Sequence, residues 1–123
     1  MEKLIEIINS FEKLDLDTEL AIKESFFEET FKKGEFIVEE GKVCNKIYFI
    51  KSGAIRRFCI EDGIEVTKWI YTDNQFVTSM SSFFEQKPSF ENFQTCEETL
   101  VYSLSYSDEQ TLLEYPIFVK FHI

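Results

Sequence analysis

The sequence contains one histidine, His122, and only three cysteines, Cys44, Cys59 and Cys96. A single histidine excludes a multi-histidine metal centre and argues against a catalytic triad built on histidine. The cysteines are widely spaced and form no CxxC pattern, so we expect free thiols in a reducing cytosol rather than zinc or an iron–sulfur cluster. The sequence therefore predicts a protein with no metal, no cofactor and no catalytic activity of its own.

Long apolar runs and positive charge are also scarce. No apolar stretch approaches the ~20 residues that span a bilayer, and the first residues form no signal-peptide core, so we expect a cytoplasmic protein without a membrane anchor. The 123 residues carry 13 basic and 23 acidic side chains, for a formal net charge of −10. Such an acidic surface repels phosphate backbones, so these residues are not expected to bind nucleic acid themselves.

Helical patterns lie at the N-terminal end of the chain. Apolar residues recur at helical spacing over residues 4–14 and predict a short amphipathic helix. Asp15 and Asp17 are candidate N-caps of a second helix, which we expect to end near residue 27. The side chains expected to face inward from this second helix are Leu20, Ala21 and Phe27.

A second helical region is predicted near the C-terminal end. Ser107 and Gln110 have the spacing of a capping box, followed by an apolar pair. Pro116 is expected to end that helix and to begin another one, whose apolar side would carry Ile117, Phe118 and Phe121.

Short β-rich runs fill the middle of the chain. All four glycines lie between residues 34 and 63 and separate runs rich in β-branched and aromatic residues, as in an antiparallel sandwich or barrel. Asp62-Gly63 predicts a tight type I′ hairpin. The segment 81–90 is too long for a tight turn. The predicted strands are 29–31, 36–38, 47–50, 55–60, 66–71, 75–80, 92–96 and 100–104.

Two motifs carry a family resemblance. Residues 33–41 read KGEFIVEEG and residues 48–53 read YFIKSG. They resemble the KGExxxxxG and YfIxxG motifs of cyclic-nucleotide-binding domains. Over about residues 18–121 the chain is similar to bacterial transcription regulators of the Crp–Fnr type.

The resemblance implies a mostly β fold with flanking helices, a double-stranded β-helix or jelly roll. The chain is then one domain, with N-terminal helices over 1–30, a β-roll over 31–105, and a C-terminal helix and the start of a dimerisation helix over 107–123. In the family a helix-turn-helix domain follows, so DNA contact is expected only through a C-terminal domain absent from this sequence, in a full-length homodimer. We expect a fragment of such a regulator, and a stand-alone sensor domain is the alternative.

The resemblance also locates the family's phosphate cassette. In the family a GEL tripeptide supplies a glutamate for the ribose, and an arginine after a short helical segment pairs with the cyclic phosphate. Counting from Phe76, the arginine position falls on Ser89. The tripeptide falls on Thr78, Ser79 and Met80, so all three anchors are absent.

Charge in this part of the chain points the same way. Residues 73–123 carry eight acidic and two basic side chains and no arginine, hence a net charge of −6. Glu91, two residues after the expected arginine position, adds repulsion toward a phosphate. The sequence therefore predicts that cyclic AMP and cyclic GMP do not bind in the family's usual way.

The resemblance still leaves a pocket that an unknown effector can occupy. Strand alternation places Trp69 and Tyr71 on one face and Lys68 on the other, and sends Arg56 and Arg57 to opposite faces. In the alternative reading, Trp69 and Tyr71 only fill the core and Arg57 pairs with a nearby acid. The candidate ligand-binding residues are Arg57, Lys68, Trp69, Tyr71, Thr78, Ser79 and Ser89, with Ser81 and Ser82 as further hydroxyl donors.

Three functions can be weighed on these grounds. The leading one is an effector-sensing domain of a Crp–Fnr-like regulator, in which a small molecule shifts the dimer helix. The second is a ligand-free interaction or dimerisation module of a constitutive regulator. The third, a cupin-type enzyme, requires several metal-binding histidines that this sequence lacks.

Overall fold

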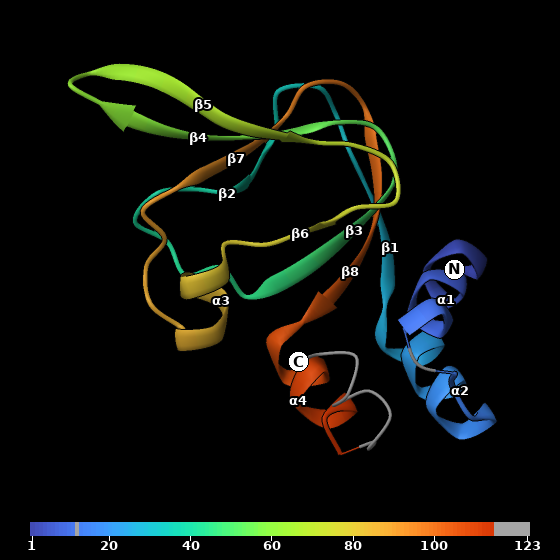
Figure 1. Cartoon of the computed structure of the whole chain (residues 1–123). Coiled ribbons are helices and arrows are strands. Elements are labelled where there is room, and N and C mark those ends of the chain that lie inside the picture. Colours follow the sequence, from blue (N-terminus) through green and yellow to red (C-terminus); the bar gives the residue numbers. More distant parts are fainter. Residues whose placement is uncertain (12, 115–123) are drawn as a thin grey trace.

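The computed structural model describes residues 1–11 and 13–114, which form two antiparallel sheets flanked by helices (Figure 1). The first sheet has the order β1-β8-β3-β6 and the second the order β2-β7-β4-β5. The strands of the first sheet are β1 (Phe27–Phe31), β8 (Thr99–Ser105), β3 (Lys46–Ser52) and β6 (Phe76–Val77). Those of the second sheet are β2 (Phe36–Val38), β7 (Asn92–Thr95), β4 (Ile55–Glu61) and β5 (Ile64–Tyr71). This arrangement confirms the expected jelly roll, mostly β with flanking helices.

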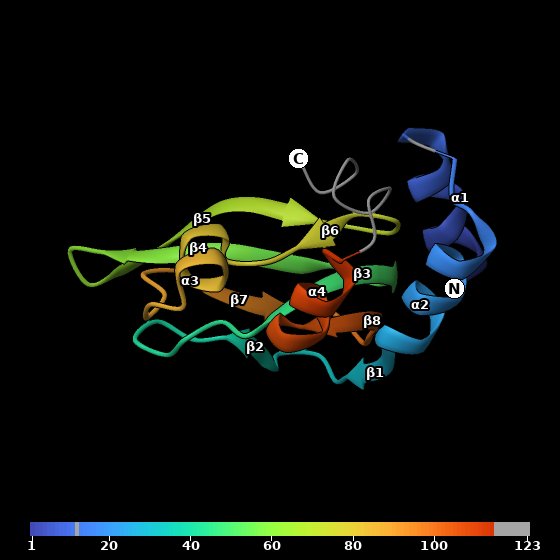
Figure 2. The ribbon, with the colours of Figure 1, turned by 90° about the horizontal axis from the view of Figure 1, so that it is seen from below.

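Three helices, α1 (Glu2–Phe11), α2 (Leu16–Ser25) and α4 (Tyr106–Leu112), pack on the outer side of the first sheet, whereas α3 (Met80–Glu85) packs against the core between the sheets. α1 and α2 are stacked at the end opposite the tip of the β4–β5 hairpin, as Figure 2 shows. α3 follows β6, and α4 follows β8. None of the helices within residues 1–11 and 13–114 is long and apolar enough to cross a membrane.

The core has two layers, separated by the first sheet. Alternation along β3 sends Tyr48 and Ile50 into the space between the sheets and Phe49 toward the helices, and all three are buried. Between the sheets they meet Ile55, Val77, Phe83, Phe93 and Val101. On the helix side Phe49 packs with Leu4, Ile8, Ile22, Leu104 and Leu112.

The second helix has the predicted cap but a different buried face. Asp15 is its N-cap and accepts a hydrogen bond from the Thr18 backbone N–H at 2.8 Å. The buried residues are Thr18 and Ile22, one turn apart. The expectation that Leu20 and Phe27 face inward is wrong: Leu20 is exposed, and Phe27, 61% exposed, opens strand β1. The helix ends at Ser25 because Phe26 already has an extended backbone.

The cap gives a pH-dependence prediction. Hydrogen bonds from Thr18 hold the pKa of Asp15 below its usual range. A depressed folded-state pKa stabilises the fold above the unfolded-state pKa, near 3.9, and this contribution is lost as the pH falls through the folded value. Thermal melts between pH 6 and pH 2.5 should therefore show a smaller acid-induced loss of stability in Asp15→Asn, which caps without titrating. Equal acid sensitivity in both proteins would show that Asp15 does not titrate differently on folding.

The central turn is confirmed, while two C-terminal details differ. Asp62 and Gly63 both have positive φ, 52° and 78°, as a type I′ hairpin requires. The strand predicted over 75–80 is only Phe76–Val77, because the chain then turns into α3. The hydroxyl of Ser105, not Ser107, caps α4 by accepting from the Asp108 N–H at 3.1 Å. The expectations about Pro116 and the helix after it lie outside the described residues.

Candidate functional site

A cavity of about 570 Å³ opens between the second sheet and the β6–α3 segment. Two walls come from neighbouring strands, β4 and β5, and the others from the chain around α3 and from the loop that precedes β7. Its lining residues are Arg57, Tyr71, Phe76, Thr78, Met80, Ser81, Phe90 and Glu91. The volume falls within the range typical of small-molecule sites.

One ion pair lies in the lining of this cavity. The β4–β7 ladder pairs Arg57 with Phe93, so that Glu91, two residues before Phe93, is the diagonal neighbour of Arg57. The Arg57 Nε lies 3.4 Å from Glu91 Oε2, and the two side chains are 34% and 12% exposed. The buried Arg57 Nε–H has no hydrogen-bond partner within the part of the chain that the structure describes. The pair therefore holds opposite charges close together while leaving hydrogen-bonding capacity unused.

The two arginines diverge as strand alternation predicts. Arg56 lies on the outer face, where it covers the ring of Phe58 at 3.9 Å and binds Glu65 at 2.8 Å and the Gln94 side chain. Arg57 lines the cavity.

Three of the predicted hydroxyl residues already have partners within the fold. Ser79 Oγ and Ser89 Oγ share a hydrogen bond of 3.0 Å, and both residues are buried. Ser89 Oγ also accepts from the Glu91 N–H at 3.0 Å. Thr78 lines the cavity but donates its hydroxyl proton to the carbonyl of Lys46 at 3.0 Å. The hydroxyl groups of Ser79 and Ser89 therefore stabilise the loop through internal hydrogen bonds and are not free to donate to a ligand.

Lys68 and Trp69 lie apart from the cavity. The ladder pairs Arg57 with Trp69 and Phe58 with Thr67, so Lys68 is the extra residue of a β-bulge. Its Nζ binds Glu61 Oε1 at 2.6 Å, and this hydrogen bond raises the pKa of Lys68. Trp69 shares the face of Tyr71 but is 57% exposed on the projecting hairpin. The structure thus brings together Arg57, Tyr71 and Thr78 from the candidate residues, and Ser81 from the further hydroxyl donors.

Sequence reasoning did not select four residues of this cavity as ligand contacts. Phe76, Met80, Phe90 and Glu91 flank the cassette positions, and Glu91 was noted only for its charge. Their closeness to Thr78 and Ser89 in the sequence is the signal that could have selected them.

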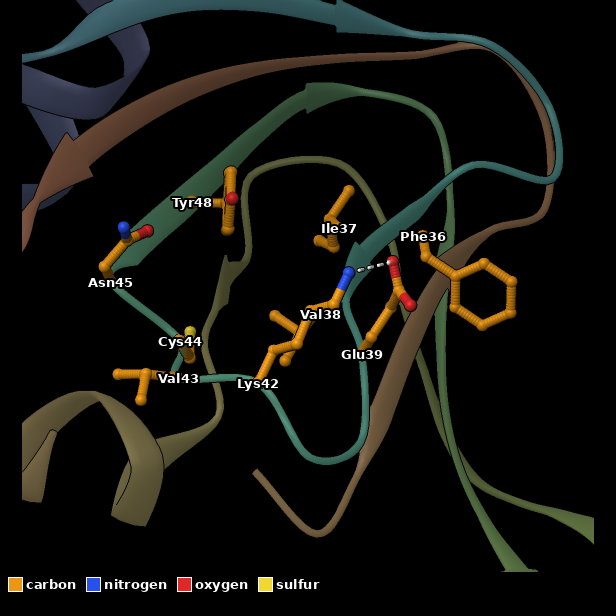
Figure 3. A pocket seen from close by; sticks show the side chains of 9 residues that line it. All are labelled: Phe36, Ile37, Val38, Glu39, Lys42, Val43, Cys44, Asn45 and Tyr48. Atoms are coloured by element: carbon orange, nitrogen blue, oxygen red, sulfur yellow. Dashed lines mark hydrogen bonds and ion pairs between the residues drawn. The ribbon is translucent and has the colours of Figure 1, made fainter. Parts of the chain in front are cut away.

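A second, smaller cavity of about 120 Å³ lies behind β2 (Figure 3). Cys44 and Tyr48 face into it, and burial raises the pKa of the Tyr48 phenol. At its rim Lys42 Nζ pairs with Glu39 Oε1 at 3.4 Å. Such a volume holds a few water molecules, not a nucleotide. The described residues contain no cluster of histidine, cysteine or acidic side chains that could hold a metal ion.

Residues 28–115 match the sequence profile of the family described as the cyclic nucleotide-binding domain. The match runs from β1 to just beyond α4 and covers more than half of the chain. The chain belongs to the cyclic nucleotide-binding domain family. No curated protein sequence matches this member closely enough to add to that assignment.

Solved structures agree on the fold. The Catabolite Activator Protein of Thermus thermophilus shares it with a TM-score of 0.78 and 21% identity, over 91% of this chain and 53% of that protein. The N-terminal domain of a transcriptional regulator from Streptomyces coelicolor gives 0.76 and 19%, over 91% and 81% of the two chains. The expected cyclic-nucleotide-binding domain is thereby confirmed, and its fold is the one that these two proteins share.

A third similar structure comes from outside bacteria. The regulatory subunit of a cAMP-independent protein kinase A from Trypanosoma cruzi, bound to guanosine, gives a TM-score of 0.75 and 17% identity, over 96% of this chain and 43% of that subunit. This domain therefore spans only about half the length of the Thermus and Trypanosoma proteins.

Proposed function

We propose that this domain senses a small-molecule effector for a bacterial transcription regulator of the Crp–Fnr type, and that it does not bind cyclic AMP in the family's usual way. The regulator would be a cytoplasmic homodimer, and DNA contact would come from a domain beyond this chain. The family assignment and the fold shared with the Thermus and Streptomyces proteins support this role. The −10 charge of the chain agrees with a sensor that leaves DNA to another part of the protein.

The Ser79–Ser89 hydrogen bond is the observation that carries the second half of the proposal. Counting from Phe76 on the family resemblance puts the cassette's glutamate and arginine at these two positions, and the two hydroxyls lie 3.0 Å apart in a buried site. Neither position carries a guanidinium that could pair with a phosphate. Glu91 lies beside the same loop and would repel a phosphate anion.

The relation to the Trypanosoma cruzi subunit adds support of a different kind. That protein is described as cAMP-independent and is bound to guanosine, which has no phosphate. In that protein the same fold therefore binds a ligand without a cyclic phosphate, and we propose that this domain likewise does not bind the family's usual ligand.

Calorimetric titration with cyclic AMP tests this proposal directly. We expect no measurable heat and no thermal stabilisation at 1 mM cyclic AMP, because loss of a buried arginine–phosphate pair removes several kcal/mol of binding free energy. A ligand present at about 100 times its dissociation constant would instead add about 2.7 kcal/mol to the free energy of unfolding. Saturable binding in the micromolar range would overturn our view of the cassette.

A ligand-free interaction module remains the second candidate, favoured by the surface of β5. This edge strand exposes Ile64, Trp69 and Ile70 to solvent, more apolar surface than a solvated edge needs. If no metabolite class stabilises the domain, and Trp69→Ala weakens self-association of the full regulator, this candidate replaces the sensor.

A further inference from the structure

The larger cavity differs from an anion site in its charge. Among the described residues that line it, the charged side chains are Arg57 and Glu91, and they neutralise each other. Building on the proposed sensor role, we propose that this cavity binds an uncharged, planar aromatic molecule carrying hydroxyl or amide groups, the class to which ribonucleosides belong.

Aromatic side chains supply the surface for a planar ligand. Tyr71, Phe76 and Phe90 line the cavity. Two of these rings are held in place by neighbours, Tyr71 by Phe93 at 6.2 Å between centroids and Phe76 by Phe49 at 5.1 Å. Phe90 is 63% exposed at the cavity wall, whereas phenylalanine side chains are mostly buried in folded proteins. A flat ring placed against these faces would remove apolar area from water and gain stacking contacts.

The ion pair supplies the polar anchors. The carboxylate of Glu91 accepts hydrogen bonds only, and its low exposure keeps competition from water small. The guanidinium of Arg57 donates only, and its side chain lines the cavity and is 34% exposed. A ligand with hydroxyl donors and a carbonyl or ring-nitrogen acceptor satisfies both groups without disturbing their charge balance.

Charge then sets the selectivity. An anionic ligand group would be repelled by Glu91, because the charge of Arg57 is already used in balancing that carboxylate. A cationic ligand group would be repelled by Arg57 for the corresponding reason. A neutral ligand avoids both penalties, so adding a phosphate to a nucleoside is expected to weaken its binding. This order of affinities, nucleoside above nucleotide, is the reverse of the one expected where an arginine binds the phosphate.

The test compares nucleosides with their phosphates on the 123-residue chain. Adenosine, guanosine, cytidine and uridine are titrated by calorimetry, each beside its 5′-monophosphate and 3′,5′-cyclic monophosphate. We expect at least one nucleoside to bind with a dissociation constant below 1 mM and to bind at least tenfold more tightly than both of its phosphates. Absence of nucleoside binding, or tighter binding of a phosphate, overturns the inference.

Matched variants locate the binding. Glu91→Gln keeps the size of the side chain and removes its charge. It should reduce the ratio of nucleoside affinity to nucleotide affinity at least threefold. Phe90→Ala removes an exposed ring and should weaken nucleoside binding at least fivefold. Glu65→Gln, which alters an arginine-paired glutamate on the outer face, should leave affinity and ratio unchanged. If Glu91→Gln and Phe90→Ala behave like Glu65→Gln, the nucleoside binds elsewhere and the inference fails.

The outcomes separate this inference from the proposed function. Tight binding of cyclic AMP contradicts the view of the cassette on which both depend. Failure of every nucleoside, with cyclic AMP also inactive, overturns the ligand class alone and leaves the altered cassette standing.

Discussion

The double variant Ser89→Arg with Glu91→Ala is expected to bind cyclic AMP about a hundredfold more tightly than the unsubstituted domain. The first substitution returns a guanidinium to the cassette position, where it can form a charge-assisted, bidentate pair with the phosphate. The second removes the carboxylate beside it and frees Arg57, its partner at 3.4 Å. Together these changes should contribute about 3 kcal/mol, which is about a hundredfold in affinity.

Calorimetric titration of four proteins measures this gain. Ser89→Arg alone is expected to gain much less, because Glu91 can pair with the new arginine. Glu91→Ala alone removes repulsion but provides no clamp. Circular dichroism and a thermal melt establish that each protein is folded, since residue 89 is buried and an arginine there must displace its surroundings. A folded double variant that gains nothing would show that Ser89 is not the cassette's arginine position.

Gly53→Ala is expected to lower the free energy of unfolding by about 3 kcal/mol or more, the largest loss we predict for a single methyl group. Gly53 ends the YFIKSG motif with φ +125°, in the region that side chains avoid. A Cβ built there would lie 2.7 Å from the Thr99 Cα, a backbone atom of strand β8, and also contact the Thr99 hydroxyl. Because the neighbour is backbone, β8 must shift, and overpacking adds to the conformational cost.

Gly41→Ala is the matched control for this prediction. Gly41 closes the other motif and also has positive φ, +88°, but nothing lies within 4 Å of the Cβ that alanine would add. It should cost only the left-handed backbone penalty, about 1–2 kcal/mol. Urea unfolding of both variants measures the difference. Equal losses of unfolding free energy in the two variants would mean that the close approach of Thr99 to Gly53 does not affect stability.

Much of the fold was predictable because it is encoded locally. Turn residues and the runs of β-branched and aromatic residues between them placed seven strands close to where the structure has them, and the Asp62-Gly63 turn follows from the positive φ that these residues tolerate. The errors fall where packing overrides local preference. Phe27 was assigned to the buried face of α2, but the helix ends at Ser25 and β1 pairs with β8 from Phe27 onward.

The site was less predictable, since its geometry depends on residues distant in the sequence. The sequence predicts a cassette without its glutamate and arginine, and it correctly sends Arg56 and Arg57 to opposite faces. It could not show that Lys68 occupies a β-bulge and pairs with Glu61, because a bulge is a property of the ladder between two strands. Nor could it show that Trp69 lies on the exposed part of the hairpin, outside the cavity.

By itself, then, the sequence determined the family and the positions of most strands along the chain, and it predicts the loss of the phosphate clamp, since each depends on which residues are present and at what spacing. Only the tertiary structure decided which side chains meet in the cavity. The β4–β7 register brings Arg57 and Glu91 to 3.4 Å across 34 positions of sequence, and the loop around α3 joins Ser79 to Ser89. Charge neutralisation acts over a few ångströms, so the charge balance of this cavity is established only when β4 and β7 have paired.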